Sequence, residues 1–191
     1  MIRKAVLFCI GLCSPLLLFG QGQGTHWYFG EQAGHKFNPD GSVTVLDDGK
    51  ITTYEGCASI SDTYGNLLFY TDGIDVYDRD HNIMENGYGL LGDSSSTQSA
   101  IIVPKPEDPD IFFIFSVDTA ISIRDTDFGM HYSVVDLSKN NGMGAITLKN
   151  INLLDETSEK IAAVIKNCFD HSIWVITMAP RDEGTRLFDT I

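Results

Sequence analysis

A repeated order of three strand types constrains this chain more than any other feature of its sequence. Short runs rich in Val, Ile, Phe, Tyr and Thr alternate with Gly, Asp, Asn and Pro, a pattern typical of β-strands joined by turns. Three times, a strand of small residues is followed by a bulky apolar strand and then by an amphipathic strand. In that order the segments are 57–60, 67–71 and 74–77, then 99–103, 112–116 and 132–135, then 161–164, 173–177 and 185–188. We therefore predict an all-β fold.

The spacing of this repeat predicts a β-propeller. The bulky strands begin at Leu67, Phe112 and Ile173, which lie 45 and 61 positions apart. Several strands repeated every ~40 to 50 residues are the signature of propeller blades. Small strands suit the crowded innermost position of a blade, and continuous apolar strands suit its middle, where neighbouring blades cover both faces. A β-sandwich is the rival fold, and the repeated order of strand types counts against it.

We expect residues 21–191 to form a partial propeller of about three four-stranded blades. The blade-like units are 56–98, 99–159 and 160–191, and the strands within 25–46 are candidates for closing the ring. Propellers usually have roughly four to eight blades, and the third unit stops at Ile191, inside its third strand. The expectation is therefore a fold that is truncated at its C-terminus and belongs to a longer protein.

Residues 1–20 predict a secretory signal peptide. Arg3 and Lys4 precede an apolar stretch from Ala5 to Phe19, and Gly20 follows it. A charged region, an apolar region and a small residue in this order are what a signal peptide requires. The apolar stretch is shorter than the ~20 residues that span a bilayer. We therefore expect cleavage after Gly20, no membrane insertion of the remaining chain, and a protein that is secreted or held at the cell surface.

Charge and cysteine content narrow the class of protein further. The chain has 13 Lys and Arg residues against 26 Asp and Glu residues, a formal net charge of −13. A basic face is needed to neutralise the phosphates of nucleic acid or to adsorb to anionic lipid, so we expect no nucleic-acid partner. Export would place Cys57 and Cys168 in an oxidising compartment, where they either form a disulfide or remain buried thiols.

Four motifs together resemble one family of exported proteins. They are Trp27–Gly30, Glu55–Asp62, Gly65–Gly73 and Ser95–Ala100. In this order they are similar to the N-terminal propeller-like region of large secreted Bacteroidetes proteins that carry PKD-type domains and a C-terminal sorting domain for type IX secretion, or that are gliding motility-associated. The resemblance implies extracellular or cell-surface placement and a binding or adhesive role, and it carries no catalytic residue across. Residues 1–191 include neither PKD repeats nor a sorting domain, which leaves export past the outer membrane open.

One acidic run is a candidate calcium site, although it matches poorly. Asp72, Asp75, Asp78 and Asp80 supply the oxygen ligands that calcium prefers. If Asp78 occupied the first position of an EF-hand loop, Ile83 would stand where glycine is needed and Gly89 where the bidentate glutamate is needed. We therefore favour a solvated strand-and-turn face over a metal site, and we expect no cofactor.

Catalytic motifs are absent from the sequence. There is no Gly-x-Ser-x-Gly segment, and the five histidines are scattered without zinc-binding spacing. Some pair of carboxylates placed for glycoside hydrolysis is almost inevitable among 26 acids, so such a pair carries little weight. Some aromatic residues could stack on sugar rings, although aromatics within strands more often belong to the core: Trp27, Tyr28, Phe112, Phe113 and Trp174.

These observations favour a non-catalytic binding or adhesion module, exported or held at the cell surface, that forms the N-terminal part of a larger protein. Its partner would be an extracellular glycan or a surface protein. Two alternatives remain: a secreted polysaccharide hydrolase on a propeller scaffold, and a structural module that spaces other domains. Paired carboxylates at the mouth of the propeller channel would favour the hydrolase.

The signal peptide leads to a direct prediction. We expect the exported protein to begin at Gln21, because the three regions of residues 1–20 stand in the order that signal peptidase requires. Mass spectrometry of the protein in the extracytoplasmic fraction measures this. Recovery of the exported chain with Met1 still attached would contradict it.

Overall fold

The computed structural model describes residues 22–119, 128–166 and 172–179, and these residues form an all-β fold. The first sheet contains β1 (His26–Tyr28), β2 (Gly34–Phe37) and β3 (Val43–Leu46), and the second contains β4 (Ala58–Ser61), β5 (Leu67–Thr71) and β6 (Val76–Asp78). The third contains β7 (Ala100–Pro104), β8 (Ile111–Val117), β9 (Met130–Asp136) and β10 (Ala145–Leu154). The fourth contains β11 (Ile161–Ile165) and β12 (Ile173–Thr177). Short 3-10 turns lie at Gly22–Gly24 and Asn140–Gly142.

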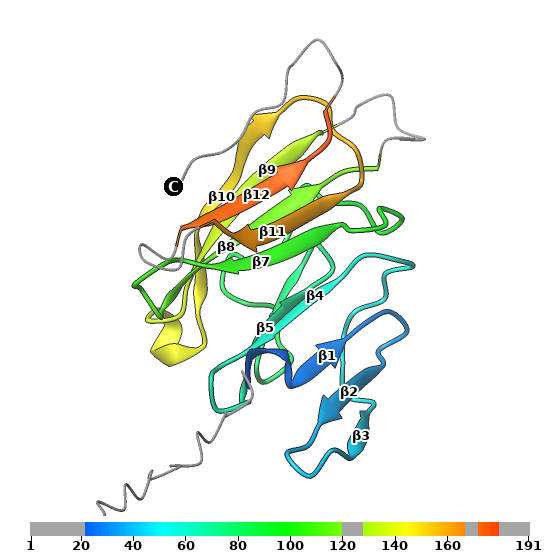
Figure 1. Ribbon diagram of the computed structural model, residues 1–191, viewed down its shortest axis with the longest axis vertical. Helices are drawn as coiled ribbons and strands as arrows, with labels where there is room; N and C mark the ends of the chain where they lie inside the picture. The colour runs from blue at the N-terminus through cyan, green and yellow to red at the C-terminus, as the bar shows by residue number, and fades with distance from the viewer. Residues whose placement is uncertain (1–21, 120–127, 167–171, 180–191) are drawn as a thin grey trace, which may run out of the picture.

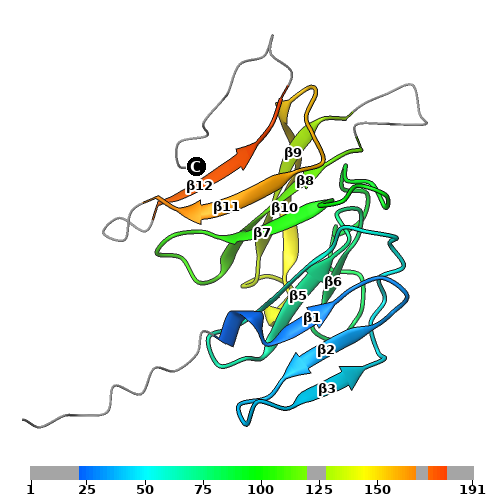
Figure 2. The ribbon, with the colours of Figure 1, turned by 45° about the vertical axis from the view of Figure 1, so that its right-hand side comes forward.

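Each sheet is an antiparallel meander, in which strands that are consecutive in the chain are also neighbours in the sheet. Figures 1 and 2 show the four sheets stacked in chain order, from β1–β3 at one end to β11–β12 at the other. The leading strands of successive sheets lie against one another: β1 contacts β4, β4 contacts β7, and β7 contacts β11. Among the described residues, no helix is long and apolar enough to cross a membrane.

The predicted order of strand types is confirmed in the second and third sheets. The small strands β4 and β7 pair with the bulky strands β5 and β8, which pair in turn with the amphipathic strands β6 and β9. In the fourth sheet the small strand β11 pairs with the bulky strand β12, and residues 185–188 lie outside the described residues. The strands expected within 25–46 form a sheet of their own.

Three four-stranded blades are not what the structure contains. The sheets of the described residues have three, three, four and two strands, and none of them closes on itself. β10 completes the third sheet, and it is not among the strands that the sequence pattern identifies. Its pairing with β9 shifts register at three places, and Asn150 has a left-handed φ of 56°. These irregularities interrupt the alternation of apolar and polar residues by which a strand is recognised.

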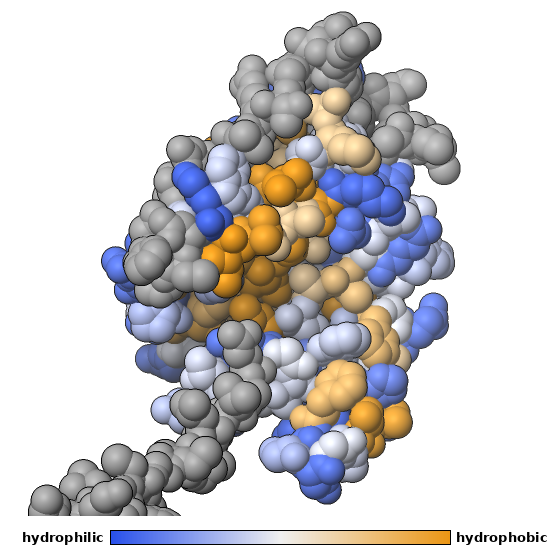
Figure 3. Space-filling view, in the orientation of Figure 1, coloured by the Kyte–Doolittle hydropathy of each residue, from blue (hydrophilic) through white to orange (hydrophobic). Residues whose placement is uncertain are grey.

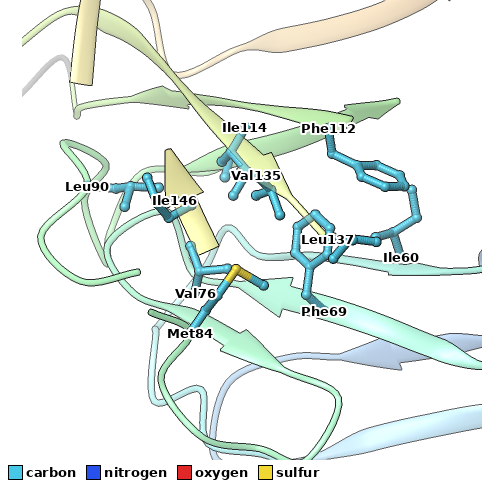
Figure 4. Close-up of a cluster of buried hydrophobic side chains, with 11 residues drawn as sticks. Ile60, Phe69, Val76, Met84, Leu90, Phe112, Ile114, Val135, Leu137 and Ile146 are labelled. Carbon is cyan, nitrogen blue, oxygen red and sulfur yellow. The ribbon is translucent and has the colours of Figure 1, made fainter. Parts of the chain in front are cut away.

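β8 reads as a continuous apolar run because both of its faces are covered. Phe112 and Ile114 point into the first core, which lies between the second and third sheets and includes Phe69. Figure 4 shows this core, with Phe69 and Phe112 in an edge-to-face contact whose ring centroids are 5.5 Å apart. The alternate residues of β8 point into the second core, shared with the fourth sheet: Phe113, Phe115 and Val117, with Ile161 and Val175 opposite.

A third core joins the first sheet to the second. It contains Tyr28 from β1, Tyr70 from β5 and Ile51 from the connection between the two sheets. The rings of Tyr28 and Tyr70 are stacked with their centroids 4.5 Å apart. The three cores therefore hold the stack together sheet by sheet, and each inner sheet is covered on both faces.

Truncating a side chain in the first core should cost much of the stability of the fold. We expect Ile114→Ala to lower the free energy of unfolding by about 2–5 kcal/mol, because the side chain is fully buried and leaves a cavity. The matched change Ile83→Ala removes the same atoms from a side chain that is 51% exposed, and should cost less than about 1 kcal/mol. Urea unfolding of both variants measures the difference. Equal losses would contradict this assignment of the core.

Candidate functional site

Trp27 is a large aromatic side chain that the fold leaves in solvent. Successive residues of a strand point to opposite faces, so β1 sends Tyr28 into the third core and Trp27 outward. Tyr28 is 3% exposed and Trp27 is 53% exposed. The interpretation of the strand aromatics as core residues is thus confirmed for Tyr28, Phe112 and Phe113 and wrong for Trp27. Trp27 is exposed because only one face of the first sheet is covered.

A pocket of about 220 Å³ lies beside Trp27, where β1 and β4 run side by side. We call it the Trp27 pocket, and its lining residues are Trp27, Tyr28, Phe29, Cys57 and Ser59. Aromatic residues beside small polar ones are a typical lining for a site that holds a ring-shaped group by stacking and orients it by a few hydrogen bonds.

The polar side chains of the Trp27 pocket are uncharged. Burial raises the pKa of the Cys57 thiol, and the carboxylate of Asp72 adds to the effect, so the thiol stays protonated at neutral pH. Cys57 carries a free thiol, and Cys168 lies outside the described residues. The Ser59 hydroxyl accepts a 2.8 Å hydrogen bond from the backbone N–H of Tyr28, which ties β4 to β1. The pocket therefore suits a neutral ligand.

The wall formed by Tyr28 is held by a cluster of polar groups behind it. The Tyr28 hydroxyl donates a 2.9 Å hydrogen bond to Asp48 Oδ1, and Asp48 Oδ2 lies 3.3 Å from His81 Nε2. The other ring nitrogen of His81, Nδ1, lies 3.0 Å from the Tyr70 hydroxyl. We call these four residues the tyrosine clamp. Burial raises the pKa of both tyrosines far above the ordinary value, so they act as neutral hydrogen-bonding groups.

Sequence reasoning did not identify the tyrosine clamp. His81 was one of five scattered histidines, and Asp48 lies in a connection with no motif of its own. The four residues come from β1, β5 and two connecting segments, and only the stacking of the first two sheets brings them together. His81 has a left-handed φ of 64°. No local signal in the sequence could have revealed this arrangement.

Two of the four calcium candidates, Asp72 and Asp78, act as parts of turns. Asp72 Oδ1 accepts the backbone N–H groups of residues 74 and 75 at 2.9 and 2.8 Å, and Asp78 Oδ1 accepts those of residues 80 and 82 at 2.9 and 3.0 Å. Asp75 Oδ1 lies 3.4 Å from the N–H of Gly89, and burial followed by the charge of Asp72 raises its pKa. Asp80 is exposed. Within the described ranges, no group of three or more His, Cys, Asp or Glu side chains could hold a metal ion.

The same use of aspartate recurs throughout the structure. A further set of aspartates accepts backbone N–H groups in turns and loops: Asp40, Asp62, Asp93, Asp108, Asp118 and Asp136. A carboxylate that accepts the N–H two residues on mimics a backbone turn. Many of the aspartates of the chain therefore stabilise the turns that connect the strands of this all-β fold.

Comparison of the chain with protein-family models, with curated proteins and with solved structures finds no match. The evidence for a function therefore comes from the geometry of the Trp27 pocket and its surroundings. That geometry combines an exposed indole, an aromatic pocket and a rigid polar support behind one wall.

The turn aspartates should make the fold sensitive to acid. Hydrogen bonds from Ser42 lower the pKa of Asp40, and hydrogen bonds from Ser138 lower that of Asp136. Burial alone would raise the pKa of Asp62, but hydrogen bonds from Asn66, Tyr64 and Gly65 outweigh it and lower the pKa. Because these pKa values lie below the unfolded value of about 3.9, the stabilisation is present above that pH and is lost as the pH falls through the folded values.

We therefore expect the Tm to fall steeply below about pH 4. The triple variant Asp40→Asn, Asp62→Asn and Asp136→Asn keeps an acceptor oxygen at each turn but cannot titrate, so its Tm should fall less steeply with acid. Thermal unfolding followed by circular dichroism at a series of pH values measures the slopes. The control is Asp80→Asn, which removes one exposed carboxylate. Parallel slopes for the triple variant and the parent chain would contradict the role of these turns.

Proposed function

We propose that this chain is an exported, non-catalytic binding module whose Trp27 pocket holds a ring-shaped group of an extracellular glycan or surface protein. The observation that carries the proposal is a half-exposed tryptophan beside a pocket that three aromatic residues line. An exposed indole loses little solvation when it stacks on a sugar ring or an aromatic side chain, and it presents a large flat surface for that contact. The tyrosine clamp supports this role, because it fixes one wall before the ligand arrives.

The scaffold in this proposal is part of a β-propeller. The support comes from three features of the four sheets: each is a meander, each leads with a strand that contacts the leading strands of its neighbours, and the inner sheets pack on both faces. A propeller places its innermost strands side by side around a central axis. β1, β4, β7 and β11 fill that position in the proposed arrangement, and the sheets form an arc that stays open among the described residues.

The ligand class in this proposal is neutral and extracellular. The walls of the Trp27 pocket carry no ionised side chain, and the whole chain has a net charge of −13, so anionic polymers are repelled. The leader at residues 1–20 and the resemblance of four motifs to surface proteins of Bacteroidetes support a location outside the cytoplasm. A neutral polysaccharide meets all of these conditions.

The hydrolase alternative finds its best support in Asp72 and Asp75. Burial, and after it the charge of Asp72, raises the pKa of Asp75, which is the pattern of a general acid beside a charged partner. However, Asp72 is 8% exposed and its Oδ1 accepts two turn N–H groups, and neither residue lines the Trp27 pocket. Binding is therefore favoured over hydrolysis. The third alternative, a spacer module, does not account for an open pocket lined by aromatic residues.

Removing the indole should weaken ligand binding. We expect Trp27→Ala to weaken the binding of a neutral extracellular polysaccharide by about tenfold, because about 1.4 kcal/mol of stacking is lost. The matched control is Tyr64→Ala, which removes an aromatic ring that is 91% exposed in a turn and lies outside the pocket lining. Binding of both variants to a panel of immobilised neutral polysaccharides and surface proteins is the measurement. Equal binding of both variants would contradict the proposed site, and release of reducing ends from the panel would favour the hydrolase.

A further inference from the structure

A second pocket, of about 220 Å³, lies where the second and third sheets meet. Its apolar walls come from both sheets and from the loop that joins β7 to β8: Ile60, Leu68, Phe112, Pro104 and Pro109. One polar wall is formed by Gln23 of the 3-10 turn at Gly22–Gly24, and we call the site the Gln23 pocket. It shares no lining residue with the Trp27 pocket.

The apolar walls of the Gln23 pocket continue the first core to the surface. Ile60 and Phe112 are 8 and 5% exposed and belong to that core, and Leu68 packs against it. Figure 4 shows Ile60 and Phe112 at one end of the core, and Figure 3 shows hydrophobic surface that reaches from β7 toward the second sheet. A cavity of about 150 Å³ with walls of Leu, Ile and Phe stays dry and holds benzene. The Gln23 pocket therefore suits an apolar body of about one ring.

Gln23 brings an unsatisfied acceptor to this apolar site. Its 3-10 turn packs so closely on the turn between β4 and β5 that a side chain at Gly22 would lie 2.6 Å from backbone atoms of Thr63 and Gly65. Gln23 Oε1 is buried and has no hydrogen-bond partner among the described residues. The terminal torsion of a glutamine amide is soft, so the amide can turn toward a donor that enters the pocket. Such a donor would remove the free-energy cost of a buried, unpaired oxygen.

The other polar groups of the pocket select against anions. The Ser61 hydroxyl is already paired, since its Oγ lies 3.1 Å from His26 Nδ1. Asp62 Oδ1 accepts the backbone N–H groups of Tyr64 and Asn66 at 2.8 and 2.9 Å. Burial opposes ionisation of Asp62, but hydrogen bonds outweigh it and lower the pKa, so the carboxylate is charged at neutral pH. A negative charge at the pocket repels a second one.

We propose that the Gln23 pocket binds a small, non-anionic molecule with an apolar body of about one ring and one hydroxyl or amine donor. The ring packs between Leu68 and Phe112, and the donor forms a hydrogen bond with Gln23 Oε1. Phenols and aromatic amines are the simplest members of this class. The site is separate from the proposed polysaccharide site and does not rest on it, because the many hydroxyls of a sugar would be left unpaired against these apolar walls.

Titration of the protein with p-cresol, followed by NMR of labelled methyl groups, tests the proposal. The methyl signals of Ile60 and Leu68 should shift as p-cresol binds. Gln23→Leu should weaken the binding of p-cresol about five- to tenfold, because one hydrogen bond is lost. Toluene, the same ring without a donor, should bind this variant at least as tightly as the parent chain, which also shows that the pocket still forms. The control Gln98→Leu makes the same change outside the pocket lining and should bind p-cresol like the parent chain.

Two further ligands and one further variant define the site. p-Toluate, an anion of similar shape, should bind at least about tenfold more weakly than p-cresol. Trp27→Ala should bind p-cresol like the parent chain, so failure of this proposal is distinguishable from failure of the polysaccharide site. Unshifted Ile60 and Leu68 signals, equal losses of p-cresol and toluene binding in Gln23→Leu, or equal affinities for p-toluate and p-cresol would each overturn the proposal. Tighter binding of N-acetyltyrosine amide than of p-cresol would assign the pocket to a peptide side chain and overturn it too.

Discussion

Burial of β8 on both faces is the interaction on which the rest of the structure depends. Alternate side chains of this one strand enter two different cores, with Ile114 in the first and Phe115 in the second. The strand therefore fixes the second and fourth sheets on opposite sides of the third. The edge-to-face contact of Phe69 with Phe112 adds a specific geometry to the first of these interfaces. Because each sheet needs cover for an apolar face, the stack extends in both directions from β8.

The same requirement explains where the candidate functional surfaces lie. A sheet at the end of a stack has one covered and one open face, so strand alternation places every second residue in solvent. In β1 this puts Tyr28 inside and Trp27 outside, and in β11 it puts Ile161 inside and Val164 outside. Ligand binding is thus proposed at the first sheet, at one end of the stack, where the packing of sheet on sheet stops. The tyrosine clamp links Tyr28 of the first sheet to Tyr70 of the second through Asp48 and His81.

The sequence pattern predicted the positions of most strands, but not every strand and not which side chains are exposed. The strands β4, β5, β7, β8, β11 and β12 lie where small and bulky runs predicted them. In β5 and β8 the apolar composition is continuous because both faces of the strand are covered. The sequence pattern did not predict β10, because its bulges and the left-handed Asn150 break the alternation of apolar and polar residues. The exposure of Trp27 was not predicted either, because it depends on how many faces of the first sheet are covered by other sheets. In the acidic run from Asp72 to Asp80, Asp72 and Asp78 accept hydrogen bonds from turn N–H groups, a role that depends on the backbone conformation and that the run of carboxylates alone does not reveal.

Hydrogen exchange of individual backbone amides, measured in dilute solution, tests the central claim that β8 and its two cores hold the stack together. The account predicts that the amides of β8, and of its partners β7 and β9, exchange most slowly, through global unfolding alone. The amides of β1–β3 and β11–β12 should exchange faster, because each of these sheets has one open face and can open locally. Protection of either end sheet equal to that of β8 would contradict the account.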